Sequence, residues 1–318
     1  MVFLGAIVAW AAPIVIAHRG ASGYLPEHTL AAAAFAYAAG ADFIEQDVVQ
    51  SKDGVLVVCH DIHIDSTTDV AQRFPGRQRA DGRYYAVDFT WPELRLLNVS
   101  ERINVSTGRP AFPQRFPHNG ASFRLSTMEE AILLVQGLNR STGRNVGLYP
   151  EIKEPAWHAR EGADPGRALL ALLSRHGYAS AADNVFVQCF EPVELKRLRH
   201  ELKTPLKLVQ LVETDGENGP ALLTPEGLKE ISTYAQGIGP HLSQIMSGVD
   251  ADGKPKLTSV VENAHQVGLV VHPYTFRADA LPPGVKTMPD LLEIFVGQAK
   301  VDGLFVDQPD VAVGFLRR

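Results

Sequence analysis

Short apolar runs alternate with helix-like patterns along almost the whole chain. The strand-like runs cover residues 13–18, 41–49, 54–59, 145–153, 185–190, 206–211, 235–239, 268–275 and 303–307. Helical patterns fill most of the gaps between them, at residues 29–39, 127–138, 166–176, 192–202, 225–234, 257–266 and 288–299. A repeated alternation of strand and helix predicts an α/β fold with a parallel sheet and helices packed outside it.

One connection breaks this rule. Only residues 50–53 separate the second and third strand-like runs. A parallel crossover needs a dozen or more residues, so this pair is predicted to be an antiparallel hairpin. A turn centred on Lys52 and Asp53 would place Glu45 opposite His60. Without the extra hairpin strand eight strands remain, which predicts a (β/α)8 barrel of the TIM type.

Residues 62–126 fit the alternation worst, because they are rich in Arg, Pro, Asn and aromatic residues and have no clear period. Long segments of this kind are usually functional or mobile. We therefore expect an insertion after the third strand that forms a lobe over the mouth of the barrel. With this insertion, residues 13–318 are predicted to form a single catalytic barrel domain.

Residues 1–12 are apolar and end in small side chains, which resembles the core and cleavage region of a secretory signal. They lack the positively charged start of such a signal, so a signal-peptide remnant and a simple tail both remain open. The run is too short to span a bilayer, and no stable membrane insertion is expected. We predict a periplasmic or secreted location, with the cytoplasm as the alternative.

Composition excludes several classes of protein. The chain has 318 residues, 45% of them hydrophobic and 21% charged, which is ordinary for a globular domain. The net charge is −6, and no long basic run is present, so nucleic acid is not an expected partner. The motifs of serine hydrolases, P-loop NTPases and dinucleotide-binding enzymes are missing as well. The two cysteines, Cys59 and Cys189, lie in apolar runs and are predicted to be buried free thiols.

His18 and Arg19 end the first strand-like run and precede Gly20. Arginine suits phosphate because its planar fork donates two parallel hydrogen bonds. A histidine beside such an arginine at a strand end suggests phosphoryl chemistry. A structural histidine next to a surface arginine would give the same pair.

Charged residues two positions apart recur at the strand ends. Glu45 and Asp47 are two residues apart, so both point to one face of their strand. Side by side and buried, they are costly without a cation between them, although a solvated strand edge remains the alternative. Glu151 is a candidate third carboxylate, and Lys153 a candidate partner for phosphate, unless the two form a surface ion pair. An all-oxygen ligand set favours Ca²⁺ or Mg²⁺ over zinc.

Eight segments form one pattern that runs along the whole chain in order. They are residues 17–23 (Ala-His-Arg-Gly-Ala-Ser-Gly), 26–29 (Pro-Glu-His-Thr), 43–48, 52–61, 149–153, 187–190, 271–275 and 301–309. Taken together, they resemble the glycerophosphodiester phosphodiesterase family, and most closely its exported bacterial type. One departure is Cys189, because serine is frequent in the family before the phenylalanine that is Phe190 here.

The resemblance implies a barrel that hydrolyses glycerophosphodiesters to sn-glycerol 3-phosphate and an alcohol. It also assigns roles, with His18 and His60 as the acid/base pair and one divalent cation, for which we favour Ca²⁺ over Mg²⁺. The implied metal ligands are Glu45, Asp47 and Glu151. The implied substrate-binding residues are Arg19 and Lys153 at the phosphate, together with Gln188, Phe190 and Tyr274. We expect Phe190, Tyr274 and Phe276 to pack on the glycerol carbons.

Two other functions are alternatives to this one. A phospholipase D of the sphingomyelinase type shares this arrangement, but it acts on lipid and should have an apolar mouth, whereas residues 62–126 are polar and rich in arginine. A binding protein or adhesin on an old enzyme scaffold should have lost a histidine or a carboxylate, and none is lost. We favour His18 as base and His60 as acid. The reverse assignment, the choice between water and the glycerol 2-hydroxyl as nucleophile, the head group and the oligomeric state stay open.

Overall fold

The computed structural model describes residues 12–118, 120–216 and 218–317. Eight strands of this described part pair in parallel in the order β14-β11-β10-β9-β8-β2-β1-β15. Their bounds are β1 Ile14–Ala17, β2 Phe43–Gln50, β8 Gly147–Ile152, β9 Phe186–Cys189, β10 Lys207–Val212, β11 Gly237–Pro240, β14 Val270–Val271 and β15 Gly303–Val306. The ring closes where the Asp302 N–H donates to the Val271 carbonyl at 3.0 Å. The predicted (β/α)8 barrel is therefore confirmed.

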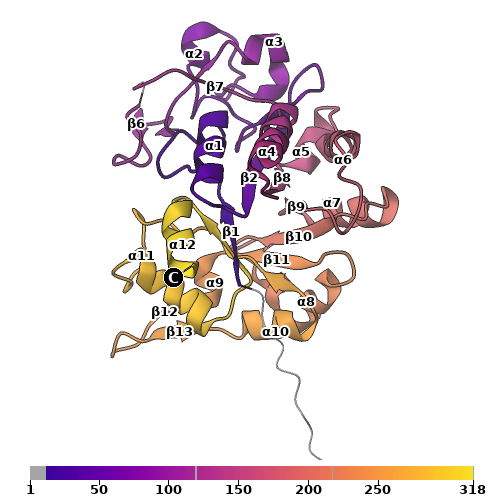
Figure 1. Ribbon diagram of the computed structural model, residues 1–318. Helices are drawn as coiled ribbons and strands as arrows, with labels where there is room; N and C mark the ends of the chain where they lie inside the picture. Colours follow the sequence, from indigo (N-terminus) through magenta and orange to yellow (C-terminus); the bar gives the residue numbers. More distant parts are fainter. Residues whose placement is uncertain (1–11, 119, 217, 318) are drawn as a thin grey trace, which may run out of the picture.

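Helices pack around the outside of this barrel (Figure 1). They are α1 Leu30–Ala38, α4 Met128–Thr142, α6 Pro165–Arg175, α7 Pro192–Lys196, α8 Pro225–Ile231, α10 Val260–Gln266, α11 Met288–Leu292 and α12 Pro309–Leu316. Short helices α5 Pro155–Arg160 and α9 Leu242–Ile245 lie in the loops, and β12 Met246–Val249 forms a hairpin with β13 Pro255–Leu257. Thr29 caps α1, since its hydroxyl accepts from the Ala32 N–H at 3.1 Å.

The inside of the barrel has an apolar floor and a polar upper layer. The floor is a buried cluster of Ile16, Phe43, Tyr149, Val209 and Phe305. Side chains two apart on a strand share a face, so the carboxylates at positions 45 and 47 stand above Phe43. Strand alternation thus places charged groups inside the barrel at the carboxyl ends of the strands, where the sites of this fold are found.

The hairpin of β2 with β3 (Leu56–Val58) is confirmed, but its predicted register is wrong by one residue. Val48 pairs with Val58 and Gln50 with Leu56, so the turn is centred on Asp53 alone. Continued, this register would set Glu45 opposite Asp61 rather than His60. The ladder ends at Val58, so His60 reaches the site from the turn after β3.

Residues 62–126 form an irregular region at the upper end of Figure 1. Its elements are α2 Val70–Arg73, a 3-10 turn at Ala86–Asp88, α3 Trp91–Leu94, and two strand pairs, β4 Asn98–Val99 with β7 Phe123–Arg124 and β5 Ile103–Asn104 with β6 Arg109–Pro110. This region shares a buried apolar cluster with the hairpin, because Val49, Val57 and Cys59 pack with Phe89 and Leu94. The cluster therefore fixes the region to the barrel.

This shared cluster gives a prediction for stability. Phe89 is fully buried and packs against Phe74 at 5.4 Å between ring centroids. Phe89→Ala is expected to lower the free energy of unfolding by about 3–5 kcal/mol, since it removes a buried ring and leaves a cavity. Urea unfolding followed by circular dichroism measures this. Leu96→Ala, at a 55% exposed position of the same region, is the control and should change the free energy by less than about 0.5 kcal/mol.

Two further expectations concern termini and cysteines. Cys59 and Cys189 are both buried and free within the described chain, as predicted. Among the described residues, no helix is both long enough and apolar enough to cross a membrane. The signal-like pattern falls almost entirely on residues 1–11, which lie outside the described part of the chain.

Candidate active site

A cavity of about 140 Å³ opens at the carboxyl ends of the barrel strands. Eight of the ten residues to which the family resemblance assigns a role line it, namely His18, Arg19, Glu45, His60, Glu151, Gln188, Phe190 and Tyr274. The other two, Asp47 and Lys153, are buried beside it, and the Lys153 ammonium donates to Glu151 Oε1 at 2.6 Å. The fold thus gathers in one place residues that are more than 250 positions apart.

His18 is held by a carboxylate from the far end of the chain. Its Nδ1 lies 2.6 Å from Oδ1 of Asp307, which follows β15 and is 1% exposed. Burial and the neighbouring Arg19 lower the pKa of His18 to about 4, against the opposite effect of Asp307. The ring is therefore neutral at pH 7, and donation from Nδ1 leaves the lone pair on Nε2 free to accept a proton.

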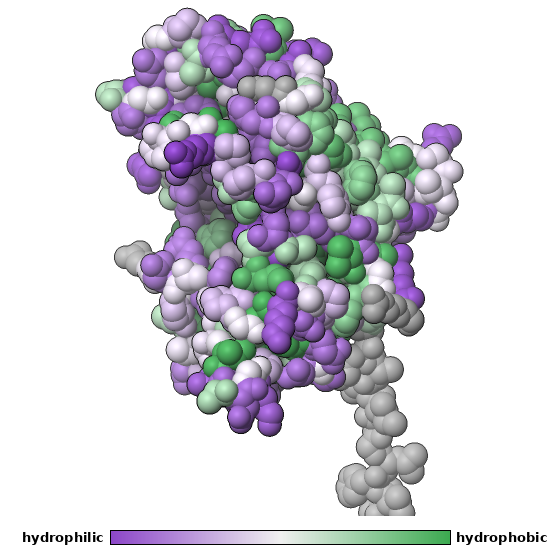
Figure 2. Space-filling model, turned by 90° about the vertical axis from the view of Figure 1, so that its left-hand side faces the viewer, coloured by the Kyte–Doolittle hydropathy of each residue, from purple (hydrophilic) through white to green (hydrophobic). Residues whose placement is uncertain are grey.

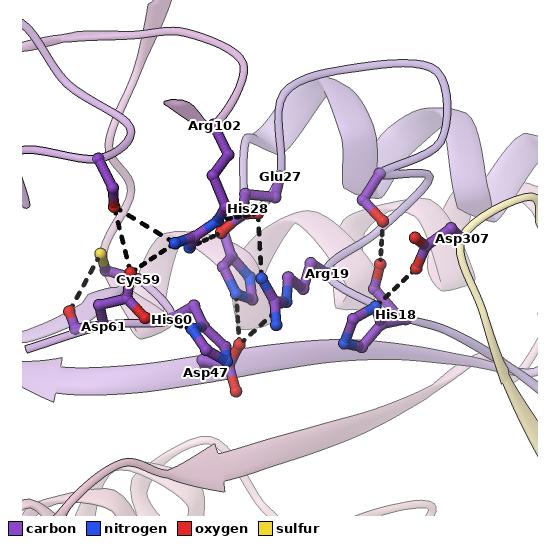
Figure 3. A network of polar contacts seen from close by, with 12 residues as sticks. His18, Arg19, Glu27, His28, Asp47, Cys59, His60, Asp61, Arg102 and Asp307 are labelled. Carbon is purple, nitrogen blue, oxygen red and sulfur yellow. Dashed lines mark hydrogen bonds and ion pairs between the residues drawn. The ribbon is translucent and has the colours of Figure 1, made fainter. Parts of the chain in front are cut away.

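His60 also has an aspartate at its Nδ1. Its Nδ1 lies 2.5 Å from Oδ1 of the adjacent Asp61, and its Nε2 lies 3.4 Å from the Lys153 ammonium. Burial, Arg19 and Lys153 lower the pKa of His60 to about 3. Figure 3 shows Arg19 between the two histidines, each of which has an aspartate at its Nδ1. The site therefore holds two neutral imidazoles, one on each side of a guanidinium.

Three carboxylates meet beside these histidines. Burial and the neighbouring Asp47 and Glu151 raise the pKa of Glu45 well above its ordinary value. Burial also raises the pKa of Glu151. For Asp47 burial acts in the same direction, but Lys153, His60 and His28 outweigh it and lower the pKa. Carboxylates crowded in this way repel one another unless a cation neutralises them.

The donor atoms fit a divalent cation. One oxygen each of Glu45 and Asp47 and one ring nitrogen of His28 lie within 4.8 Å of one another. The buried oxygens Asp47 Oδ1 and Gln188 Oε1 have no hydrogen-bond partner among the described residues. Free carboxylate and amide oxygens are the ligands that Ca²⁺ and Mg²⁺ prefer.

His28 is a participant that the sequence analysis did not single out. Its Nε2 lies 2.7 Å from Asp47 Oδ2, so the ring holds the carboxylate whose other oxygen, Oδ1, accepts no hydrogen bond from the described residues. His28 lies in the segment Pro26-Glu-His-Thr29, quoted above only for its resemblance to the family. Its position in that segment is the sequence feature that could have indicated a role for His28 in the site.

Arg19 is anchored from two sides. Its backbone N–H donates to Glu45 Oε2 at 2.5 Å, and its guanidinium donates to Glu27 Oε2 at 3.0 Å. The backbone takes the left-handed conformation, with φ of 56°, which a non-glycine residue adopts only when its surroundings impose it. This conformation brings the guanidinium to the cavity wall, 3.6 Å from Asp47 Oδ2.

Aromatic rings form another part of the wall. Phe190 and Tyr274 meet edge to face with centroids 5.8 Å apart, and the Tyr274 hydroxyl donates to the Val212 carbonyl. The expectation for Phe276 is wrong, because its side chain is fully buried against Phe295. The segment after β14 closes the barrel against β15 instead of alternating as a strand. His241 and Arg277 also line the cavity, and no sequence pattern indicated them.

Known proteins share both this sequence and this fold. Residues 18–311 match the glycerophosphoryl diester phosphodiesterase family. The glycerophosphodiester phosphodiesterase of Haemophilus influenzae is 40% identical over 96% of this chain and 90% of its own length. The protein of the same name from Treponema pallidum is 38% identical over 95% of this chain and 91% of its own.

Solved structures agree with the barrel. A glycerophosphodiester phosphodiesterase from Agrobacterium tumefaciens has a TM-score of 0.63 at 19% identity, over 95% of this chain and 99% of its own. An Oleispira antarctica phosphodiesterase, solved in complex with sn-glycerol-3-phosphate, has a TM-score of 0.64 at 19% identity. The match covers 96% of this chain and 98% of its own. The family resemblance and the enzyme class expected from the motifs are confirmed, and the chain belongs to the glycerophosphoryl diester phosphodiesterase family.

Proposed function

We propose that this protein hydrolyses glycerophosphodiesters to sn-glycerol 3-phosphate and an alcohol, using a divalent cation and two histidines. The observation that carries the proposal is the pairing of His18 and His60, two neutral imidazoles that line one cavity and each have an aspartate at Nδ1. The names of the relatives, and the product bound to the Oleispira antarctica enzyme, support this substrate class.

Charge neutralisation is the first task of the site, because a phosphodiester repels an approaching nucleophile. Glu45, Asp47 and Glu151 would hold the cation, which when bound neutralises part of the phosphate charge. Arg19 lines the cavity and would donate to the phosphate oxygens as a fork. Lys153 lies close enough to Glu151 and His60 to add a second positive charge.

Proton transfer is the second task. In the favoured assignment, His18 Nε2 takes the proton of the nucleophile while His60 Nε2 gives one to the leaving alcohol oxygen. Neutral His60 must first take up that proton from solvent water, and the negative phosphate favours this because an opposite charge stabilises the imidazolium. The reverse assignment uses the same atoms. Each such transfer contributes about 10²–10⁴-fold to the rate.

Ca²⁺ is the cation that we propose, ahead of Mg²⁺. Mg²⁺ demands near-ideal octahedral geometry, whereas Ca²⁺ accepts irregular sets of oxygens at longer distances. Here the candidate donors come from β2, β8 and the segment before α1, and Glu151 is already bonded to Lys153. Such a mixed set suits the more tolerant ion.

Location and domain organisation remain proposals. We propose a periplasmic or secreted protein whose residues 1–12 belong to a signal or a tail, and cell fractionation of the protein expressed with its native N terminus would test this. Residues 13–318 would form one catalytic domain with 62–126 over the barrel mouth. The contact of Arg115 with Asp307, 192 positions apart, supports this placement.

A substrate comparison tests the proposed function. With Ca²⁺ or Mg²⁺ added, glycerophosphocholine is expected to yield sn-glycerol 3-phosphate, measured with glycerol-3-phosphate dehydrogenase. Sphingomyelin and lysophosphatidylcholine should react far more slowly, because the cavity is small. Figure 2 shows hydrophobic and hydrophilic residues side by side on the face of the molecule that it draws. Turnover of the lipids alone would favour the phospholipase D alternative.

A further inference from the structure

Two arginines of the insertion contact the aspartates that hold the histidines. The Arg115 guanidinium donates to Asp307 Oδ2 at 2.6 Å, and the Arg102 guanidinium donates to Asp61 Oδ2 at 2.6 Å. In both cases the other oxygen, Oδ1, belongs to the histidine. The same three-part chain of arginine, aspartate and histidine therefore occurs twice in one site.

Arg115 is fixed on several sides. Its side chain is only 4% exposed, and it forms a two-bond contact with Asp279 at 2.8 and 3.0 Å. It also donates to the Ser22 carbonyl at 3.2 Å and lies 3.7 Å from the centre of the Phe112 ring. Arg277 donates to the same Asp307 oxygen at 2.9 Å, but Arg115 makes the shorter contact, so the two guanidiniums together with His18 fix the carboxylate in one orientation.

Arg102 binds two carboxylates at once. It donates to both oxygens of Glu27, at 2.6 and 3.1 Å, while its Nη1 binds Asp61 (Figure 3). Glu27 is also the carboxylate that accepts from Arg19. Arg102 therefore connects the partner of His60 with the partner of the proposed phosphate-binding arginine.

We propose that Arg102 and Arg115 are positioning residues for the reaction, each fixing the aspartate that orients one of the two histidines. The proposal rests on the proposed function, in which those histidines transfer protons. A buried carboxylate needs positive partners, and Asp307, which is 1% exposed, has two of them, Arg115 at 2.6 Å and Arg277 at 2.9 Å. A ring that is free to turn would bring Nε2 into line with the reacting oxygen less often. The insertion is thereby part of the catalytic apparatus.

Kinetics of methionine variants form the main test. Arg102→Met and Arg115→Met are expected to lower kcat for glycerophosphocholine by about 10- to 100-fold, the usual cost of losing a residue that orients a catalytic group. KM should stay within about threefold, because neither arginine lines the substrate cavity. Lysine at either position should restore part of kcat, since it supplies the positive charge.

Arg83→Met is the matched control. Arg83 lies in the same insertion and forms an equally tight two-bond pair with Asp65, at 2.7 and 2.7 Å. Among the described residues, neither Arg83 nor Asp65 forms a hydrogen bond with His18, His60 or the aspartates that hold them. The control should lose similar thermal stability and keep kcat within about twofold. If all three folded variants keep wild-type kcat, or all three lose it equally, the proposal is wrong.

A double-mutant cycle tests whether Arg115 acts through Asp307. Asp307→Asn is expected to lower kcat strongly, because the amide disturbs the orientation and tautomer of His18. In that background Arg115→Met should add less than about threefold, since the path through which it acts is already broken. Multiplication of the two single effects would instead show that Arg115 works independently of Asp307.

A measurement without substrate separates this inference from the proposed function. In proton NMR, the His18 Nδ1–H that donates to Asp307 should give a downfield resonance in the wild type, assigned through its loss in His18→Ala. It should vanish or broaden in Arg115→Met and persist in Arg83→Met. An unchanged resonance in Arg115→Met refutes the positioning role. Absence of glycerophosphocholine turnover by the wild type would refute the proposed function alone.

Discussion

Replacing His18 or His60 with alanine is expected to lower kcat by at least about 100-fold while the protein stays folded. Both rings line the cavity, and in the proposed mechanism each of them transfers a proton there. The fold should survive, because Asp307 keeps Arg115 and Arg277 as partners when His18 is removed. Steady-state turnover of glycerophosphocholine with saturating Ca²⁺ measures the effect.

The control for this pair is His200→Ala, at an exposed position far along the chain, after α7. It should keep full activity. Circular dichroism and the thermal midpoint show whether each variant is folded. Near-normal turnover in a folded His18→Ala or His60→Ala protein would remove that residue from the mechanism.

Removing the divalent cation is expected to abolish activity, and adding Ca²⁺ or Mg²⁺ should restore it. Without a cation, Glu45 and Glu151 are buried beside Asp47 with pKa values raised by burial, so the carboxylates lose charge or repel one another. A ligand that binds the folded state alone at 100 times its Kd adds about 2.7 kcal/mol to the free energy of unfolding. Ca²⁺ should therefore also raise the thermal midpoint.

In Asp47→Asn, most of the rise of the thermal midpoint with Ca²⁺ should be lost. The substitution neutralises a buried carboxylate whose Oδ1 accepts no hydrogen bond from the described residues. Asp81→Asn, at an exposed position of the insertion, should respond like the wild type. Full turnover by exhaustively metal-free protein would overturn the metal assignment. A thermal midpoint that Ca²⁺ leaves unchanged would indicate that the carboxylates serve another purpose.

The fold and the main site residues could be predicted because local rules govern them. Strand and helix periods predict the barrel, and the period of two puts Glu45 and Asp47 on one face. The hairpin register could not be obtained in the same way. Gly54 takes φ of 82°, which makes the loop three residues long and shifts the pairing by one.

The contacts that orient the histidines could not be predicted from the sequence. Asp307 is 289 positions from His18, and Arg102 is 41 positions from Asp61. No periodicity or spacing rule links residues that meet only when the barrel closes and the insertion folds onto it. Asp61 and Asp307 stand in the segments that resemble the family, but nothing local in them indicates an orienting role.

The attachment of the segment around Arg102 and Arg115 has a consequence for how the enzyme loses activity. The rest of the insertion shares an apolar cluster with the hairpin, whereas this segment is tied to the barrel by the ion pairs of those two arginines. Structures open locally where few apolar contacts hold them. Inactivation by mild denaturant or protease should therefore precede global unfolding, with the first exchange of amide protons in residues 100–118.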